Sequence, residues 1–334
     1  LFKQSIVDGF QHEEADNWTK YGDAWSERCE SESVRIDYNG QSVMAVPYDM
    51  PVIGCKTKNI GTLRLWQAEP VEEFNFELFN QQKYLEASSE KTFAEDISRV
   101  LYDDTREGKK LRLKQQYFFS SASLADIVRK HKAQFGTLDN LADYITIQLN
   151  DTHPVISIPE LMRILMDNEG YSFDRAFDIV CKVFNYTNHT IMAEALEKWE
   201  CSLVEELLPR IYEIIIMINE KFISDMYRKG LEAKDFNDMR IIIGNLVHMA
   251  HMAVYCSSYV NGVAEIHTQI LKDTVLASWY KLYPERFQNK TNGITQRRWL
   301  ALCNRELSSL ITELLGSDEW IVKLDELRKL EKYA

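Results

Sequence analysis

Residues 145–166 read I-T-I-Q-L-N-D-T-H-P-V-I-S-I-P-E-L-M-R-I-L-M, and this stretch decides the predicted fold. Its apolar, β-branched beginning, residues 145–149, predicts a buried strand. A polar turn follows at residues 150–154, and the S-I-P-E sequence at 157–160 has the capping-box pattern that begins a helix. A strand, a polar turn and a helix in this order predict an α/β fold. Ligands of open α/β sheets bind beyond the carboxyl ends of the strands, where this turn would lie.

The next part of the chain repeats this order of strand, polar turn and helix. Residues 179–184 predict a second strand, residues 185–190 (N-Y-T-N-H-T) a second polar turn, and residues 191–199 a helix with Thr190 as its N-cap. Two such turns side by side would bring four polar side chains to one crevice: Asp151, His153, Asn188 and His189. Neutral donors and acceptors with few fixed charges suit a ligand rich in hydroxyl groups.

A purely structural interpretation of these turns stays open. Aspartate and asparagine are common in turns because their side chains bond to the nearby main chain. Asp151 and Asn292 would then only shape their turns, and His153 and His189 would be packing groups.

The rest of the chain predicts a helix-rich fold behind an N-terminal β meander. Residues 34–38 and 42–46 read as a hairpin about Asn39-Gly40, and residues 62–66 supply a further strand. From residue 88 onward helical patterns dominate, including a long amphipathic helix over residues 111–132.

Composition excludes several functions. The 334 residues carry a net charge of −12, which argues against nucleic-acid binding, and no apolar run is long enough to span a membrane. Six scattered cysteines without a C-x-x-C pair predict reduced thiols and a cytoplasmic protein. His248 and His251 lie three residues apart but lack a third ligand, and nothing links His267 to them, so we predict no metal site.

Four long motifs carry a resemblance to a known family. They are Q-L-N-D-T-H-P-x-x-x-I-P-E-L-M-R (148–163), Y-T-N-H-T (186–190), V-N-G-V-A-x-I-H (260–267) and F-Q-N-K-T-N-G-I-T-x-R-R-W (287–299). In this order and spacing the chain resembles the glycogen/maltodextrin α-glucan phosphorylases. The resemblance covers nearly the whole chain.

The resemblance implies a domain plan. It assigns residues 1–292 to most of an N-terminal glucan-binding domain, an incomplete doubly wound α/β (GT-B-like) fold. Residues 293–334 would begin a C-terminal pyridoxal-phosphate domain. The family's lysine pattern E-A-S-G-T-x-N-M-K does not occur in the sequence, so we expect an internal fragment that holds no residue for the cofactor and is inactive alone.

The resemblance also assigns the site. His189 and Asn292 would be catalytic, the former by bonding the transferred sugar and by turning its main-chain carbonyl toward the anomeric carbon. The substrate-binding residues would be Asp151, His153, Thr190 and Glu197. The loop at residues 102–110 is shorter than the family's mobile gate, and we assign no catalytic role to Asp103 or Asp104.

The activity implied is phosphorolysis of glycogen, starch or maltodextrin by inorganic phosphate, with α-glucose 1-phosphate released with retention. The full protein would use pyridoxal 5'-phosphate and form a homodimer. Two other interpretations stay open: a nucleotide-sugar glycosyltransferase of the same fold, and a non-catalytic glucan-binding fragment.

Overall fold

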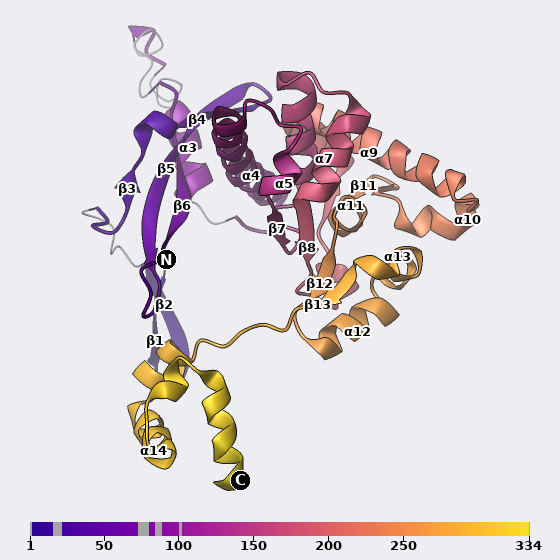
Figure 1. The fold of residues 1–334 in the computed structure, drawn as a ribbon. Coiled ribbons are helices and arrows are strands. Elements are labelled where there is room, and N and C mark those ends of the chain that lie inside the picture. Colours follow the sequence, from indigo (N-terminus) through magenta and orange to yellow (C-terminus); the bar gives the residue numbers. More distant parts are fainter. Residues whose placement is uncertain (1, 16–21, 73–79, 84–88, 100–101, 334) are drawn as a thin grey trace.

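The chain forms two main sheets joined by a helical body (Figure 1). The computed structural model describes residues 2–15, 22–72, 80–83, 89–99 and 102–333. The first main sheet is antiparallel and contains β3 (Glu27–Arg28), β4 (Val34–Tyr38), β5 (Gln41–Ile53) and β6 (Ile60–Glu69). A separate hairpin precedes it, formed by β1 (Phe2–Val7) and β2 (Phe10–Ala15).

The predicted hairpin at residues 34–46 is confirmed. Tyr38 pairs with Gln41 across the Asn39-Gly40 turn, where Gly40 has a φ of +80° that favours glycine. Ile36 and Tyr38 alternate with exposed residues and are buried against the helical body. The Tyr38 hydroxyl donates to the Lys114 main-chain oxygen at 2.9 Å, which joins this sheet to helix α4 (Arg106–Phe135).

The second main sheet is parallel and carries the predicted polar turns. Its strands are β7 (Ile147–Asn150), β8 (Phe184–Thr187), β12 (Val260–Gly262) and β13 (Phe287–Asn289), in the order β13-β12-β8-β7. All neighbouring pairs are parallel, so the four carboxyl ends lie along one edge. The strand order follows the chain order, so these four strands do not include the reversal that a doubly wound sheet requires.

The second predicted strand was misplaced. Residues 179–183 belong to helix α7 (Phe173–Val183), and the strand begins only at Phe184. The buried residues of α7 recur at helical spacing: Ala176, Phe177, Ile179, Val180 and Val183. The same β-branched residues that suggested a strand are therefore the buried face of a helix.

The predicted helix at residues 191–199 is also wrong. This segment has one 3-10 turn, Ala193–Ala195, and then enters β9 (Lys198–Glu200). β9 completes a small antiparallel sheet with β11 (Leu246–His248) and β10 (Ile242–Ile243). Trp199 is buried opposite Val247 in that sheet. Pairing with a distant strand overrides the local helical preference of the segment.

Helix α6 (Ser157–Arg163) begins where the capping box predicted, but Glu160 is not a cap. Its carboxylate is fully buried and accepts bonds from Tyr117 at 3.0 Å and Ser121 at 2.7 Å. Arg163 bonds the same carboxylate at 2.8 Å. Glu160 thus ties α6 to α4 through the core. Helix α4 itself begins at Arg106, inside the segment expected to be a loop, with Thr105 as its N-cap.

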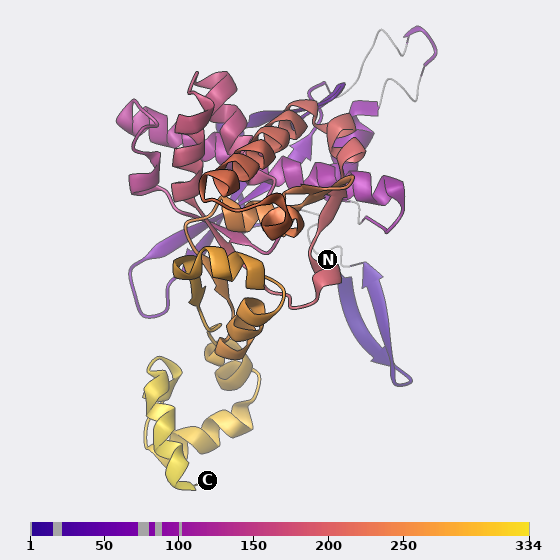
Figure 2. The same cartoon turned by 90° about the vertical axis from the view of Figure 1, so that its right-hand side faces the viewer.

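Of the remaining helices, α3 (Ser89–Arg99) packs against β5 and β6 of the antiparallel sheet. The others surround the parallel sheet or follow it in the chain: α5 (Leu141–Tyr144), α8 (Cys201–Leu207), α9 (Pro209–Arg228), α10 (Ala233–Phe236), α11 (Met249–Tyr255), α12 (Glu265–Asp273), α13 (Ala277–Leu282) and α14 (Arg305–Leu315). After β13 the chain leaves the sheet, and α14 with its neighbouring turns lies apart from the helical body (Figure 2). Within the described ranges, none of the helices combines the length and apolar character needed to cross a bilayer.

Candidate functional site

All the predicted site residues except Glu197, which precedes β9, follow strands of the parallel sheet at its carboxyl edge. Three main-chain hydrogen bonds, each 2.9 Å long, tie these turns together: Asp151 N–H to Thr187 O, Asn188 N–H to Asn261 O and Asn292 N–H to Val263 O. Turns that are far apart in the sequence are therefore immediate neighbours. Asp151, His189 and Asn292 all lie in turns at the same edge of the parallel sheet.

The turn after β7 holds Asp151 in an unusual conformation. Its φ is +66°, in the left-handed region, which aspartate tolerates better than most residues. One carboxylate oxygen accepts the Thr152 main-chain N–H at 2.6 Å. The structural interpretation of Asp151 is thus correct in part, because the side chain stabilises its own turn.

The turn after β8 separates a buried residue from an exposed one. Asn188 is fully buried, bonds the Tyr186 hydroxyl at 3.1 Å and accepts the Thr190 N–H at 3.0 Å. It therefore shapes the turn and does not face a crevice, contrary to the expectation from sequence. His189 is exposed at the tip of the same turn and remains available to a ligand.

Arg112 of α4 joins two predicted residues. Its Nη2 lies 3.1 Å from His153 Nδ1 and 2.8 Å from Glu197 Oε1. Gln116, one helical turn along α4, donates to both Glu197 carboxylate oxygens at 3.0 and 3.2 Å. Because a guanidinium only donates, His153 Nδ1 is the acceptor, and the neutral ring carries its proton on Nε2.

A cavity of about 290 Å³ opens beside this cluster. It is lined by His153, Arg112 and Gln116 together with the rings of Tyr102 and Phe119. The Arg112 guanidinium lies 4.9 Å from the centre of the Tyr102 ring, within cation–π range. Aromatic faces beside hydrogen-bonding groups suit the mixed apolar and hydroxyl surface of a sugar.

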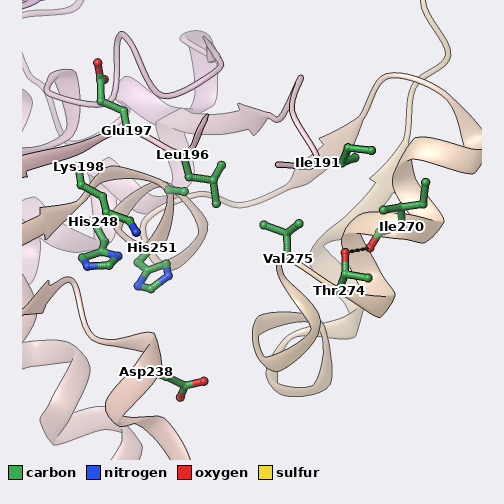
Figure 3. Close-up of a pocket in the computed structure, with 11 residues that line it drawn as sticks. Ile191, Leu196, Glu197, Lys198, Asp238, His248, His251, Ile270, Thr274 and Val275 are labelled. Carbon is green, nitrogen blue, oxygen red and sulfur yellow. Dashed lines mark hydrogen bonds between the residues drawn. The ribbon is translucent and has the colours of Figure 1, made fainter. Parts of the chain in front are cut away.

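A larger cavity, about 720 Å³, lies on the other side of the segment that carries Glu197 (Figure 3). Ile191, Leu196 and Ile270 form apolar parts of its wall, and in Figure 3 the Glu197 carboxylate is directed away from its two histidines. Of the predicted site residues only Glu197 borders it. The Glu197 carboxylate and its partners Arg112 and Gln116 thus lie on the opposite side of this segment.

The two histidines of the larger cavity stack with ring centres 4.8 Å apart. Burial lowers the pKa of His248 to about 4, helped by the nearby His251 and Lys198. His251 Nδ1 lies 2.8 Å from the Arg240 main-chain oxygen, and burial lowers the pKa of His251 too. Both rings are therefore neutral at pH 7. Over the described part of the chain, no three histidine, cysteine or carboxylate side chains gather as metal ligands would.

Sequence reasoning missed Arg112, Gln116 and His267. Arg112 and Gln116 are four residues apart on one helix, a spacing that puts them on the same face, but only the fold brings that face to Glu197. His267 had no visible partner in the sequence. In the structure its Nδ1 accepts the Val263 N–H at 3.1 Å, directly behind the site.

Comparison with known proteins identifies the family of the chain. The family model described as carbohydrate phosphorylase matches residues 1–334. The chain is 42% identical over 368 residues to the muscle form of glycogen phosphorylase from Bos taurus, and 44% identical over 360 residues to the brain form from Homo sapiens. It is 43% identical over 364 residues to glycogen phosphorylase 2 of Dictyostelium discoideum.

These alignments use 99–100% of this chain but only 43%, 42% and 36% of the three relatives, respectively. The chain thus spans less than half of each relative's length. The match to the family model extends from the first residue to the last. The chain therefore belongs to the carbohydrate phosphorylase family.

Proposed function

We propose that this chain is the glucan-binding part of an α-1,4-glucan phosphorylase. The whole protein would cleave the non-reducing end of glycogen, starch or maltodextrin with inorganic phosphate and release α-glucose 1-phosphate. The observation that supports this most is the main-chain bonding of the strand-end turns, because it gathers Asp151, His189 and Asn292 at one edge. The relatives' names point to the same substrate class.

Each residue has a proposed role. His189 and Asn292 bond hydroxyl groups of the glucose unit that is transferred, and the His189 main-chain carbonyl stabilises positive charge at its anomeric carbon. Four residues bind the substrate around them: Asp151, His153, Thr190 and Glu197. Arg112 holds Glu197 and His153 in place, as its two contacts indicate.

The groups on this edge do not suit pyridoxal phosphate. A Schiff base needs a lysine enclosed beside the cofactor, whereas Lys290, which follows β13, is exposed. The edge offers amide, imidazole, hydroxyl and carboxylate groups, which match sugar hydroxyls better than a phosphate dianion. We therefore assign no cofactor contact to this chain and propose that pyridoxal phosphate and inorganic phosphate bind elsewhere in the whole protein.

The domain plan is a proposal as well. Residues 1–292 would form most of a GT-B-like N-terminal domain, and residues 293–334 would begin the next domain. The departure of the chain from the sheet after β13 (Figure 1) supports this division. We further propose that the whole protein is a cytoplasmic homodimer.

Calorimetric titration with maltoheptaose tests the glucan site. Asp151→Asn keeps an acceptor for the Thr152 N–H but removes the charge, and we expect it to weaken binding about tenfold, the value of one charge-assisted hydrogen bond. Asp143→Asn, an exposed change in α5, is the matched control and should bind like the wild type. Equal affinity in all three proteins, or release of glucose 1-phosphate by this chain alone, would contradict the proposal.

A further inference from the structure

His267 lies at the junction of three turns that carry the proposed glucan site. It is in the first turn of α12, directly after β12. Its Nδ1 accepts the Val263 main-chain N–H at 3.1 Å. The carbonyl of the same residue, Val263, accepts the Asn292 N–H at 2.9 Å. A short chain of two hydrogen bonds thus runs from His267 through Val263 to Asn292.

The other face of the ring adjoins the turn after β8. His267 Nε2 is buried on this side of the ring. The Thr190 main chain hydrogen-bonds the ring, and His189 lies close enough to act on it electrostatically. Burial lowers the pKa of His267, and His189 lowers it further while Thr190 raises it.

These contacts fix the tautomer. A main-chain N–H can only donate, so Nδ1 is unprotonated and the proton of the neutral ring is on Nε2. The buried donor is therefore the one on the side of residues 189 and 190. A hydrogen bond from this donor to the Thr190 main chain is consistent with the raising effect of Thr190 on the pKa of the ring.

Gly262 of β12 lets the imidazole ring of His267 lie close to the strand, because glycine has no side chain. A Cβ atom on Gly262 would lie 2.7 Å from His267 Nδ1 and 2.4 Å from Thr268 Oγ1. Thr268 also bonds Asn289 at the end of β13, at 3.1 Å. The first turn of α12 is thus packed tightly against the carboxyl ends of both strands.

We infer that His267 is a positioning residue for the glucan site, holding Asn292 through Val263 and the His189–Thr190 turn through its Nε2–H. This inference rests on the proposed function, because it assigns the two turns to sugar binding. His267 itself has no proposed contact with the sugar. The sequence predicted no role for it, and the relatives' names assign it none.

Amide hydrogen exchange and maltoheptaose titration on the 334-residue chain test this role. His267→Phe removes both nitrogen atoms but keeps a ring. We expect faster exchange at Asn292, shifted amide resonances at His189 and Thr190, and about tenfold weaker maltoheptaose binding, the effect of losing about one hydrogen bond. His267→Asn keeps an acceptor near the Nδ1 position and should restore slow exchange at Asn292.

His131→Phe is the matched control, because His131 is also buried and also makes one hydrogen bond, to Asn140 at 2.9 Å, far along α4 from the site. It should leave exchange at Asn292 and glucan affinity unchanged. Unchanged exchange and resonances in His267→Phe would overturn the inference, as would altered exchange with unchanged affinity. Failure of the wild type to bind maltoheptaose would instead contradict the proposed function, and the exchange comparison would still decide whether His267 orients the two turns.

Discussion

The guanidinium of Arg112 lies 2.8 Å from the carboxylate of Glu197, whose side chain is only 9% exposed. A charged group so nearly buried depends on its partner, because removal of one member of such a pair leaves the other poorly solvated. The pair joins α4 to the segment that separates the two cavities.

Replacement of Arg112 should therefore affect both stability and binding. We expect Arg112→Met to lower the free energy of unfolding by about 2 kcal/mol and to weaken maltoheptaose binding about tenfold. Urea denaturation and calorimetry measure the two effects. Arg175→Met removes an exposed pair with Asp139 and should change both by little. Similar results for the two variants would show that the Arg112–Glu197 contact contributes neither to stability nor to binding.

Glu160 provides a test of the core without involving the site. Its carboxylate is fully buried and bonded to Tyr117, Ser121 and Arg163. Glu160→Ala leaves these three side chains without their buried partner and should lower the free energy of unfolding by about 3–5 kcal/mol. Glu213→Ala, at an exposed pair with Arg210, should cost less than about 1 kcal/mol. A small loss in Glu160→Ala, measured by urea denaturation, would mean that the network adds little.

Gly262 should tolerate no side chain. In Gly262→Ala the new methyl group would meet Thr268 and His267 at distances below 3.0 Å, so α12 must shift. We expect a loss of about 1–3 kcal/mol in unfolding free energy and weaker maltoheptaose binding. Gly61→Ala in β6 is the control, since the nearest atom to its new methyl group would be the Val52 main-chain oxygen of β5, 3.8 Å away. Equal stability of the two variants would show that the packing behind the site is loose.

His248 should make stability depend on pH. Its pKa is about 4 in the folded chain and 6.5 without the fold, so the unfolded state binds more protons between these values. The free energy of unfolding should therefore fall as the pH drops from 6.5 toward 4. His248→Gln should reduce this loss without abolishing it, because His251 titrates in the same direction. His12→Gln, which removes an exposed imidazole, is the surface control. A wild-type profile in His248→Gln would refute the assignment.

The predictable parts of the fold were those with local signals. The alternation of residues 34–38 and the Gly40 turn determine the first hairpin, and the apolar run before Asp151 marks β7. The strand prediction for residues 179–183 was wrong because Ile and Val can lie on the buried face of a helix as readily as in a strand. Residues 198–200 could not be predicted as a strand from the local sequence, because β11, the strand that pairs with them, lies far along the chain.

The site was predictable to the same extent. The turns that hold Asp151 and His189 stand out because polar residues follow apolar runs. Arg112 and His267 could not be found in this way, since each acts through a contact formed only when distant elements pack. The burial of Asn188 likewise depends on Tyr186 and on the neighbouring strand β12.

The most direct test is to map the amide resonances of the wild-type chain during titration with maltoheptaose. A single glucan site at the strand ends predicts saturable shifts concentrated at residues 151–153, 188–190, 197, 262–263 and 292. Shifts confined to residues around His248 and His251, or no saturable shifts at all, would contradict it.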